Sequence, residues 1–237
     1  MSEHRLNLPA IESSLKAVQA DFDRINRSLS QPRDPMTDEV RENMMSGYRY
    51  VDEALAQGTD FFRLGNSRGL LELNILVLSG KSKARRKQFR QHIASTEQRF
   101  YGEEGGGIGD LMEWLARNQD DNIWKRAAGV YIHILSQPQL YIEGNHRTGA
   151  LIMAYMLARE GKPPFVLSLE NAKAYFEPSS LAQVTKKQSL SMLIRLPKLR
   201  KRLAKLLKRS AEMRYLIQQA KMGNATAPDL VSPQLKT

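Results

Sequence analysis

Apolar residues recur at every third or fourth position along most of this chain, the spacing that places them on one face of an α-helix. The pattern predicts helices over residues 11–29, 40–55, 70–78, 110–117, 123–136, 148–161, 168–176, 179–193 and 198–222. Prolines within residues 31–35 end the first helix, and Gly58 ends the second. The helix over 148–161 is apolar on most of its faces, so we expect it to lie at the centre of the fold.

Residues 89–100 depart from the helical pattern and are the best candidate for a β-strand. The prediction rests on Phe89, Ile93 and the loop over 101–109, which contains five glycines. A basic connector over 81–87 precedes this segment. We therefore predict a mainly α fold with a small β-hairpin. Its parts are a helical arm over 1–35, a core over 36–180, a basic helical region over 181–222 and a flexible tail over 223–237.

The composition excludes several kinds of functional site. The chain has 237 residues and no cysteine, which excludes disulfides, thiolate zinc sites and cysteine nucleophiles. A cysteine-free protein fits a reducing compartment, so we expect a cytoplasmic location. No apolar run approaches the ~20 residues of a membrane span. Residues 1–5 are polar and lack the apolar segment of a signal peptide.

The net charge of +11 is concentrated near the end of the chain. Residues 186–209 hold 10 of the 36 Lys and Arg residues and no Asp or Glu, so the remainder has 26 basic against 25 acidic residues. Leucines recur among these cations. Three interpretations remain open for this basic segment: a helix packed on the core with a solvated basic face, a contact with nucleic acid, or a contact with an anionic membrane surface.

A short polar loop leads into the apolar helix over 148–161 and carries the candidate chemistry. The start of a helix exposes backbone N–H groups and the positive end of its dipole. Gly144 permits a tight turn, Asn145 adds an amide donor and Arg147 adds a cation with bidentate geometry for phosphate. Glu143 can hold a divalent cation that bridges phosphates. The alternative is an ordinary capped turn in which Arg147 pairs with Glu143.

The stretch from Gln139 to Ala150, read QLYIEGNHRTGA, resembles the signature of the Fic/Doc (Fido) family, H-[PIx]-F-x-[DE]-[GA]-N-[GK]-R-[TN]. Tyr141 takes the place of the family's Phe. Residues 127–132 and 111–115 resemble the helices that precede the family's motif and follow its flap. Residues 40–175 fit a core of this family, a helical Fido fold with a β-hairpin flap. The resemblance implies that residues 89–101 form the flap and dock a target protein by adding a strand.

The resemblance also implies a ligand and roles for the loop. The ligand would be ATP or another nucleotide with Mg²⁺. Glu143 would hold the metal, while Gly144, Asn145, His146 and Arg147 would bind the phosphates. His146 occupies a variable family position, where it either donates to a phosphate or faces solvent.

This chain departs from the signature at the position of the family's catalytic base. The family's His takes a proton from the target hydroxyl, and Gln139 cannot do so, because an amide does not titrate at useful pH. His133, six residues earlier on a predicted helix, either replaces that base or simply packs there. A second family Arg is replaced by Ala150. Glu42 weakly matches the glutamate of the family's inhibitory helix, with Arg147 as the only motif cation left to pair with.

Two functions follow from these observations. The first is a Fic-like nucleotide-binding or phosphate-binding protein of the AMP-transfer class, with weak or no activity because the base is replaced. The alternative is a Fido-fold pseudoenzyme that acts as a partner-binding or nucleic-acid-binding module. The basic residues 186–209 would then supply a polyanion contact.

Overall fold

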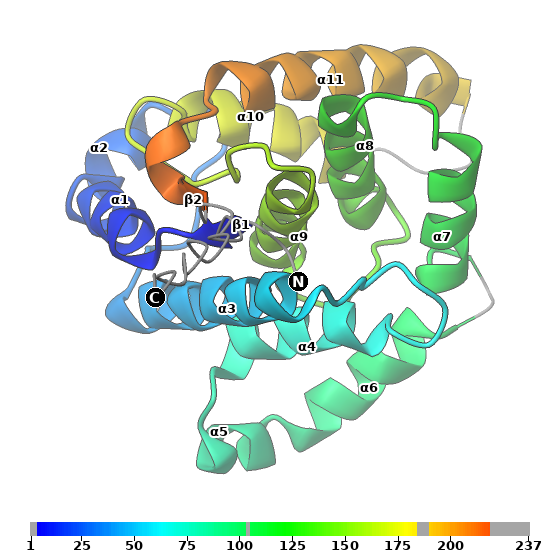
Figure 1. The fold of residues 1–237 in the computed structure, drawn as a ribbon, viewed down its shortest axis with the longest axis horizontal. Helices are drawn as coiled ribbons and strands as arrows, with labels where there is room; N and C mark the ends of the chain where they lie inside the picture. The colour runs from blue at the N-terminus through cyan, green and yellow to red at the C-terminus, as the bar shows by residue number, and fades with distance from the viewer. Residues whose placement is uncertain (1–3, 103–104, 184–189, 219–237) are drawn as a thin grey trace, which may run out of the picture.

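The computed structural model describes residues 4–102, 105–183 and 190–218 (Figure 1). In these ranges the chain forms eleven α-helices, one short 3-10 helix and two strands. The strands are β1 (His4–Leu6) and β2 (Leu216–Gln218), which pair antiparallel with Arg5 opposite Ile217. The mainly α fold class with a small two-stranded sheet is thereby confirmed. The sheet joins the two ends of the described chain.

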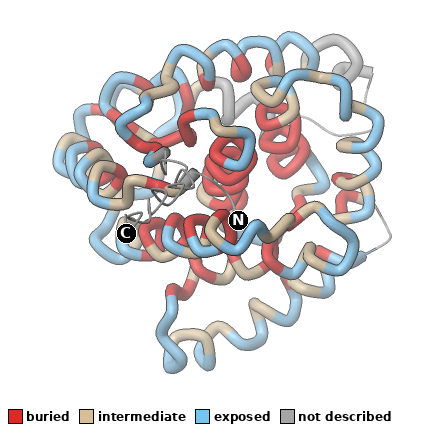
Figure 2. Tube along the Cα trace, in the orientation of Figure 1, coloured by how far each residue is buried: buried red, intermediate tan, exposed pale blue. Residues whose placement is uncertain are grey.

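The centre of the fold is α9 (Asn145–Arg159), which is buried along almost its whole length (Figure 2). It packs against α8 (Ile123–Leu135), α3 (Asp38–Gln57) and α4 (Arg68–Ser79). A Cβ at Gly149 would lie 2.6 Å from the Tyr131 ring, so this glycine allows α8 and α9 to approach closely. The predicted central position of this helix is confirmed. In its first turn, His146 and Arg147 are only partly buried.

The helical arm at the N-terminus consists of two helices, α1 (Leu8–Ala20) and α2 (Phe22–Arg27). The prediction of one helix over 11–29 missed the break at Asp21, whose carboxylate binds the Arg24 guanidinium in the next turn. Asp favours such boundary positions because its side chain competes with the helical backbone for hydrogen bonds. The apolar spacing continues across the break, so periodicity alone could not detect it.

The prediction of a strand over 89–100 is wrong. The chain forms α5 (Lys83–Gln88) and then α6 (Arg90–Phe100). Thr96 and Phe100 are buried, and Ile93 is half-buried, so the inward positions have helical spacing. A target protein therefore has no β-strand in this segment to which it could add a strand. The basic connector expected over 81–87 is also largely helical.

The remaining helices are α7 (Ile108–Arg117), α10 (Ala172–Gln183), α11 (Leu190–Arg209) and the 3-10 helix η1 (Met213–Tyr215). The helix predicted over 198–222 is wrong at both ends, because α11 includes Pro197 and stops at Arg209. Burial of Leu203 and Leu207 in the core, where α11 packs against α8, holds this helix in place. The predicted tail over 223–237 lies outside the described residues. No helix in the described ranges is long and apolar enough to cross a membrane.

Candidate functional site

The loop singled out in the sequence links α8 to α9, and Gly144 is its tightest point. This residue precedes the first residue of α9 and has φ +75° and ψ +7°, a left-handed conformation that favours glycine. A Cβ at Gly144 would lie 3.0 Å from Asn74 Nδ2 and 3.2 Å from Val77 Cγ2. The glycine thus allows the loop to lie directly against α4.

Helix α4 anchors this loop through its side chains and its main chain. The buried Asn74 amide donates to the Glu143 carbonyl oxygen at 2.8 Å and to Thr148 Oγ1 at 3.0 Å. The Tyr141 hydroxyl donates to the Leu70 carbonyl oxygen at 3.0 Å. Because these donors and acceptors are buried, the backbone path from Tyr141 to Thr148 is set before any ligand binds.

Asn145 closes the loop on itself. Its Oδ1 accepts from the Tyr141 N–H at 3.0 Å, and its Nδ2 donates to the Tyr141 carbonyl oxygen at 2.8 Å and to Gln139 Oε1 at 3.2 Å. The side chain is buried, and both amide hydrogens are used within the loop. In this conformation Asn145 shapes the site, and the amide donor expected for a phosphate would first have to leave one of these partners.

Gln139 is held from two sides. Its Nε2 donates to the Leu135 carbonyl oxygen at 3.2 Å. Arg99 of α6 donates from both Nε and Nη2 to the Gln139 carbonyl oxygen, at 3.0 Å each. Helix α6 therefore contributes to the site through Arg99, a role that the sequence pattern did not indicate.

Arg147 lies in the first turn of α9, where its guanidinium contacts α4 and also lines the cavity described below. Its Nη1 donates to the Val77 carbonyl oxygen at 3.0 Å, and its Nη2 lies 3.9 Å from Glu143 Oε1. Burial lowers the pKa of Arg147, and the charges of Glu143, Asp34 and Glu39 oppose that change. The guanidinium stays protonated, since arginine does not lose its proton in proteins. The predicted pairing with Glu143 exists but is long and leaves the Glu143 side chain 61% exposed.

His146 is half-buried between three parts of the chain, so the solvent-facing interpretation is wrong. Its Nδ1 lies 3.0 Å from the Tyr131 hydroxyl, and its Nε2 lies 3.4 Å from Nη1 of Arg33. The Tyr175 hydroxyl donates to the His146 carbonyl oxygen at 3.1 Å. The residue thus connects α8, α10 and the arm beside Arg147.

A cavity of about 520 Å³ opens at the start of α9, within the range of small-molecule sites. Its polar wall is formed by Arg33, Asp34, Gln139, Glu143, Gly144, Asn145, His146 and Arg147. Its apolar wall is formed by Leu15, Phe22, Pro35, Met36, Val40, Met44, Tyr48, Ile142, Ala150, Phe165, Leu167, Tyr175 and Phe176. Every loop residue predicted for the site therefore lines one cavity. Sequence reasoning missed the contribution of the arm, because residues 31–35 had been interpreted only as the end of a helix.

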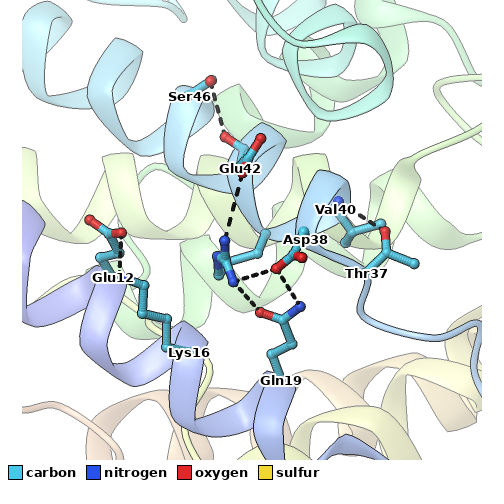
Figure 3. Close-up of polar contacts among 9 residues, drawn as sticks. Glu12, Lys16, Gln19, Thr37, Asp38, Val40, Glu42 and Ser46 are labelled. Atoms are coloured by element: carbon cyan, nitrogen blue, oxygen red, sulfur yellow. Dashed lines mark hydrogen bonds and ion pairs between the residues drawn. The ribbon is translucent and has the colours of Figure 1, made fainter.

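Two further predicted residues lie away from this cavity. His133 is buried on α8 with its ring 6.3 Å from the Trp114 ring, and it does not line the cavity. Glu42 is exposed, and its Oε1 lies 3.7 Å from Nη2 of Arg41. Arg41 also binds Asp38. Figure 3 labels Asp38 and Glu42 within this cluster of polar contacts. The structure therefore brings neither residue to the loop: His133 packs in the core, and Glu42 pairs with its neighbour.

Two carboxylates near the loop are the candidate ligands for a metal ion. Glu143 is the loop's own carboxylate, and Asp34 lines the same cavity. Among the described residues, no group of three or more His, Asp or Glu side chains is arranged to hold a metal ion. A Mg²⁺ ion bound through one carboxylate, ligand phosphates and water needs no larger cluster, so Glu143 fits that mode.

No model of a known protein family matches this chain, and no curated protein and no solved structure matches it. The function is therefore inferred from the residues and geometry of the loop and its cavity.

Proposed function

We propose that this chain is a Fic-like protein that binds ATP or another nucleotide through its phosphates and has weak or no AMP-transfer activity. One observation carries the proposal. The loop that resembles the Fido signature lines a cavity of about 520 Å³ and presents Arg147 and the start of α9 to it. A helix N-terminus and a guanidinium together favour a phosphate. Aromatic and aliphatic side chains in the same cavity offer a surface to a nucleobase.

Each residue has a distinct task in this proposal. Arg147 binds a phosphate, and the first N–H groups of α9 add donors that have no partner within the helix. Glu143 would hold Mg²⁺, whose charge would offset that of the phosphates. Gln139 can orient a target hydroxyl by hydrogen bonding but cannot remove its proton. The proposal also keeps the cytoplasmic location that the cysteine-free composition predicts.

Isothermal titration calorimetry with Mg-ATP tests this proposal. Arg147→Ala should weaken binding by about 1.5–3 kcal/mol, the range for hydrogen bonds to charged groups. Arg159→Ala is the matched control, because Arg159 ends the same helix, pairs with Asp60 and does not line the cavity. Equal affinity of wild type and Arg147→Ala would remove this site from consideration. Thermal unfolding of both variants shows whether the contact of Arg147 with Val77 matters for folding.

A second candidate function, contact with nucleic acid, is favoured by the two faces of α11. Leu199, Leu203, Ala204 and Leu207 are buried in the core. From residue 196 onward, where the side chains of this helix are described, the exposed cations are Lys198, Lys201, Arg202, Lys205, Lys208 and Arg209. Because the apolar face is covered by protein, it cannot insert into a bilayer as an interfacial helix would. A row of exposed cations on a rigid helix suits the regularly spaced phosphates of a nucleic acid.

Charge reversal on α11 tests the second candidate better than truncation, because truncation would also remove the buried Tyr215 and Leu203. Lys201, Lys205 and Lys208 should be changed together to Glu. The control changes Lys83, Lys87 and Arg90 to Glu, an equal change of charge on exposed residues of α5 and α6. Binding of a labelled duplex should fall steeply with salt and be lost only in the α11 variant. Binding that is insensitive to salt, or equal in both variants, would contradict the proposal.

A further inference from the structure

A second guanidinium, from a distant part of the sequence, lines the same cavity as Arg147. Arg33 lies in the segment after α2, and its Nη1 is 3.4 Å from Nε2 of His146, the neighbour of Arg147. We propose that Arg33 is the second phosphate-binding group of this site, so that the phosphates of one nucleotide contact both guanidinium groups. This inference rests on the proposed nucleotide-binding function and names a residue outside the motif loop.

The backbone of Arg33 is fixed by a reciprocal pair of hydrogen bonds. Its N–H donates to Asn26 Oδ1 at 2.7 Å, and its carbonyl oxygen accepts from Asn26 Nδ2 at 2.9 Å. The same segment is tied to α10, because Ser30 donates from its N–H and its hydroxyl to the Glu177 carboxylate. Arg33 therefore starts from a fixed point near the cavity, which reduces the entropy lost when its side chain binds a ligand.

The guanidinium of Arg33 is positioned as well. Its Nη2 donates to the Phe176 carbonyl oxygen at 3.1 Å, and its Cζ lies 5.6 Å from the centroid of the Phe176 ring. A guanidinium has five N–H donors in a planar fork, so one arginine side chain can contact more than one acceptor. Arg33 is thus held at the wall of the cavity that Arg147 also lines.

The other charges of the cavity explain why one arginine would be insufficient. Asp34 and Glu143 line the cavity, and both act on the charge of Arg147. With Arg147 alone, these two carboxylates would leave the wall negative and would repel a phosphate. With Arg33 included, the two cations balance the two carboxylates, and a metal ion at Glu143 would make the wall positive.

The aromatic side chains beside Arg33 indicate which ligands this arrangement suits. Phe176 contacts Tyr175, with ring centroids 5.3 Å apart, and Phe22, with ring centroids 6.4 Å apart; all three line the cavity. A nucleoside phosphate has a flat base for this aromatic wall and phosphates for the two arginines. Adenosine has the same base and ribose but no phosphate, so the comparison of ADP with adenosine separates the contribution of the cations from that of the aromatic wall.

Calorimetric titration of the full chain with ADP and with adenosine tests the inference. Arg33→Ala should weaken ADP binding roughly 10- to 100-fold, the loss of one charged hydrogen-bonding group, and leave adenosine binding unchanged. Arg24→Ala is the matched control, because Arg24 belongs to the same arm, is exposed and pairs with Asp21. It should bind both compounds as wild type does.

The outcomes separate this inference from the proposed function. Loss of ADP binding in Arg147→Ala with no loss in Arg33→Ala overturns the inference and keeps the function. Equal losses for ADP and adenosine in Arg33→Ala also overturn it, because Arg33 would then only maintain the cavity. A wild-type protein that binds neither compound overturns both proposals. If thermal unfolding shows that Arg33→Ala does not fold, Arg33→Gln decides, since glutamine keeps a long polar side chain but not the charge. Weaker ADP binding with unchanged adenosine binding supports the inference, and unchanged ADP binding overturns it.

Discussion

The side-chain amide of Asn145 donates a hydrogen bond of 3.2 Å to the side-chain oxygen of Gln139. This bond links the first residue of α9 to the position at which the Fido signature has its catalytic His. The amide of Gln139 is therefore part of the structure of the loop as well as a residue of the cavity wall. A substitution at position 139 changes both the chemistry available to a ligand and one support of the loop.

Gln139→His should raise AMP transfer from a very low wild-type level. A positioned general base contributes about 10²–10⁴-fold, and an imidazole titrates near neutral pH whereas an amide does not. The measurement is the incorporation of labelled AMP from ATP into protein, followed by intact mass. The gain should disappear in the double variant with Arg147→Ala, which keeps the base and loses the phosphate contact. High activity in wild type would mean that another group serves as the base.

Asn145→Ala should destabilise the fold more than an ordinary loss of a helix cap. The substitution removes three hydrogen bonds and leaves the buried N–H and carbonyl of Tyr141 without their partner, at a cost of about 2–3 kcal/mol. Asn122→Ala is the control, because Asn122 caps α8 through a single bond to the Lys125 N–H. Its loss should cost about 1 kcal/mol. Urea unfolding measures both, and equal costs would contradict the role assigned to Asn145.

Gly144→Ala should be more damaging than Gly58→Ala. Both glycines have left-handed φ angles, +75° and +66°, so an alanine costs about 1–2 kcal/mol at either position. A Cβ at Gly58 would meet nothing within 4 Å, whereas one at Gly144 would lie 3.0 Å from Asn74 Nδ2. The crowding should add about 1–3 kcal/mol. Unfolding free energies of the two variants measure the difference, and equal values would show that the loop moves away from α4 at no cost.

Stability should decline at alkaline pH because of buried tyrosines. Burial raises the pKa of Tyr48, Tyr141 and Tyr175 above the usual value. Below about pH 10 these phenols are protonated in both states, so their stabilising effect is fully present. At higher pH the unfolded chain loses protons that the folded chain keeps, and each such tyrosine lowers stability by about 1.4 kcal/mol per pH unit.

Urea unfolding at a series of alkaline pH values tests this dependence, with phenolate absorbance as a second signal. Tyr48→Phe should reduce the slope of stability against pH, because one titrating group is removed. It also removes the hydrogen bond from Tyr48 to the Phe165 carbonyl oxygen, so stability at neutral pH should fall. An unchanged slope in this variant would mean that Tyr48 ionises equally in the two states.

The helices of the core were predictable because α3 buries one broad face at helical spacing and α9 buries most of its surface. The helix predicted over 40–55 is α3, and the helix over 148–161 is α9, which begins earlier, at Asn145. Residues 90–100 were misassigned because only Thr96 and Phe100 are buried there, too few for periodicity to indicate a helix. The end of α11 at Arg209 was missed because β2 forms only by pairing with β1, at the other end of the chain.

The sequence by itself determined the mainly helical class, the central helix and the short polar loop that precedes it, because these depend on neighbouring residues and their spacing. It also determined that no histidine stands at position 139. Only the tertiary structure decided which side chains surround that loop. Asn74 lies 69 residues before Glu143, and Arg33 lies 113 residues before His146, yet each contacts its partner directly. Contacts over such separations arise from the packing of whole helices, which local spacing does not encode.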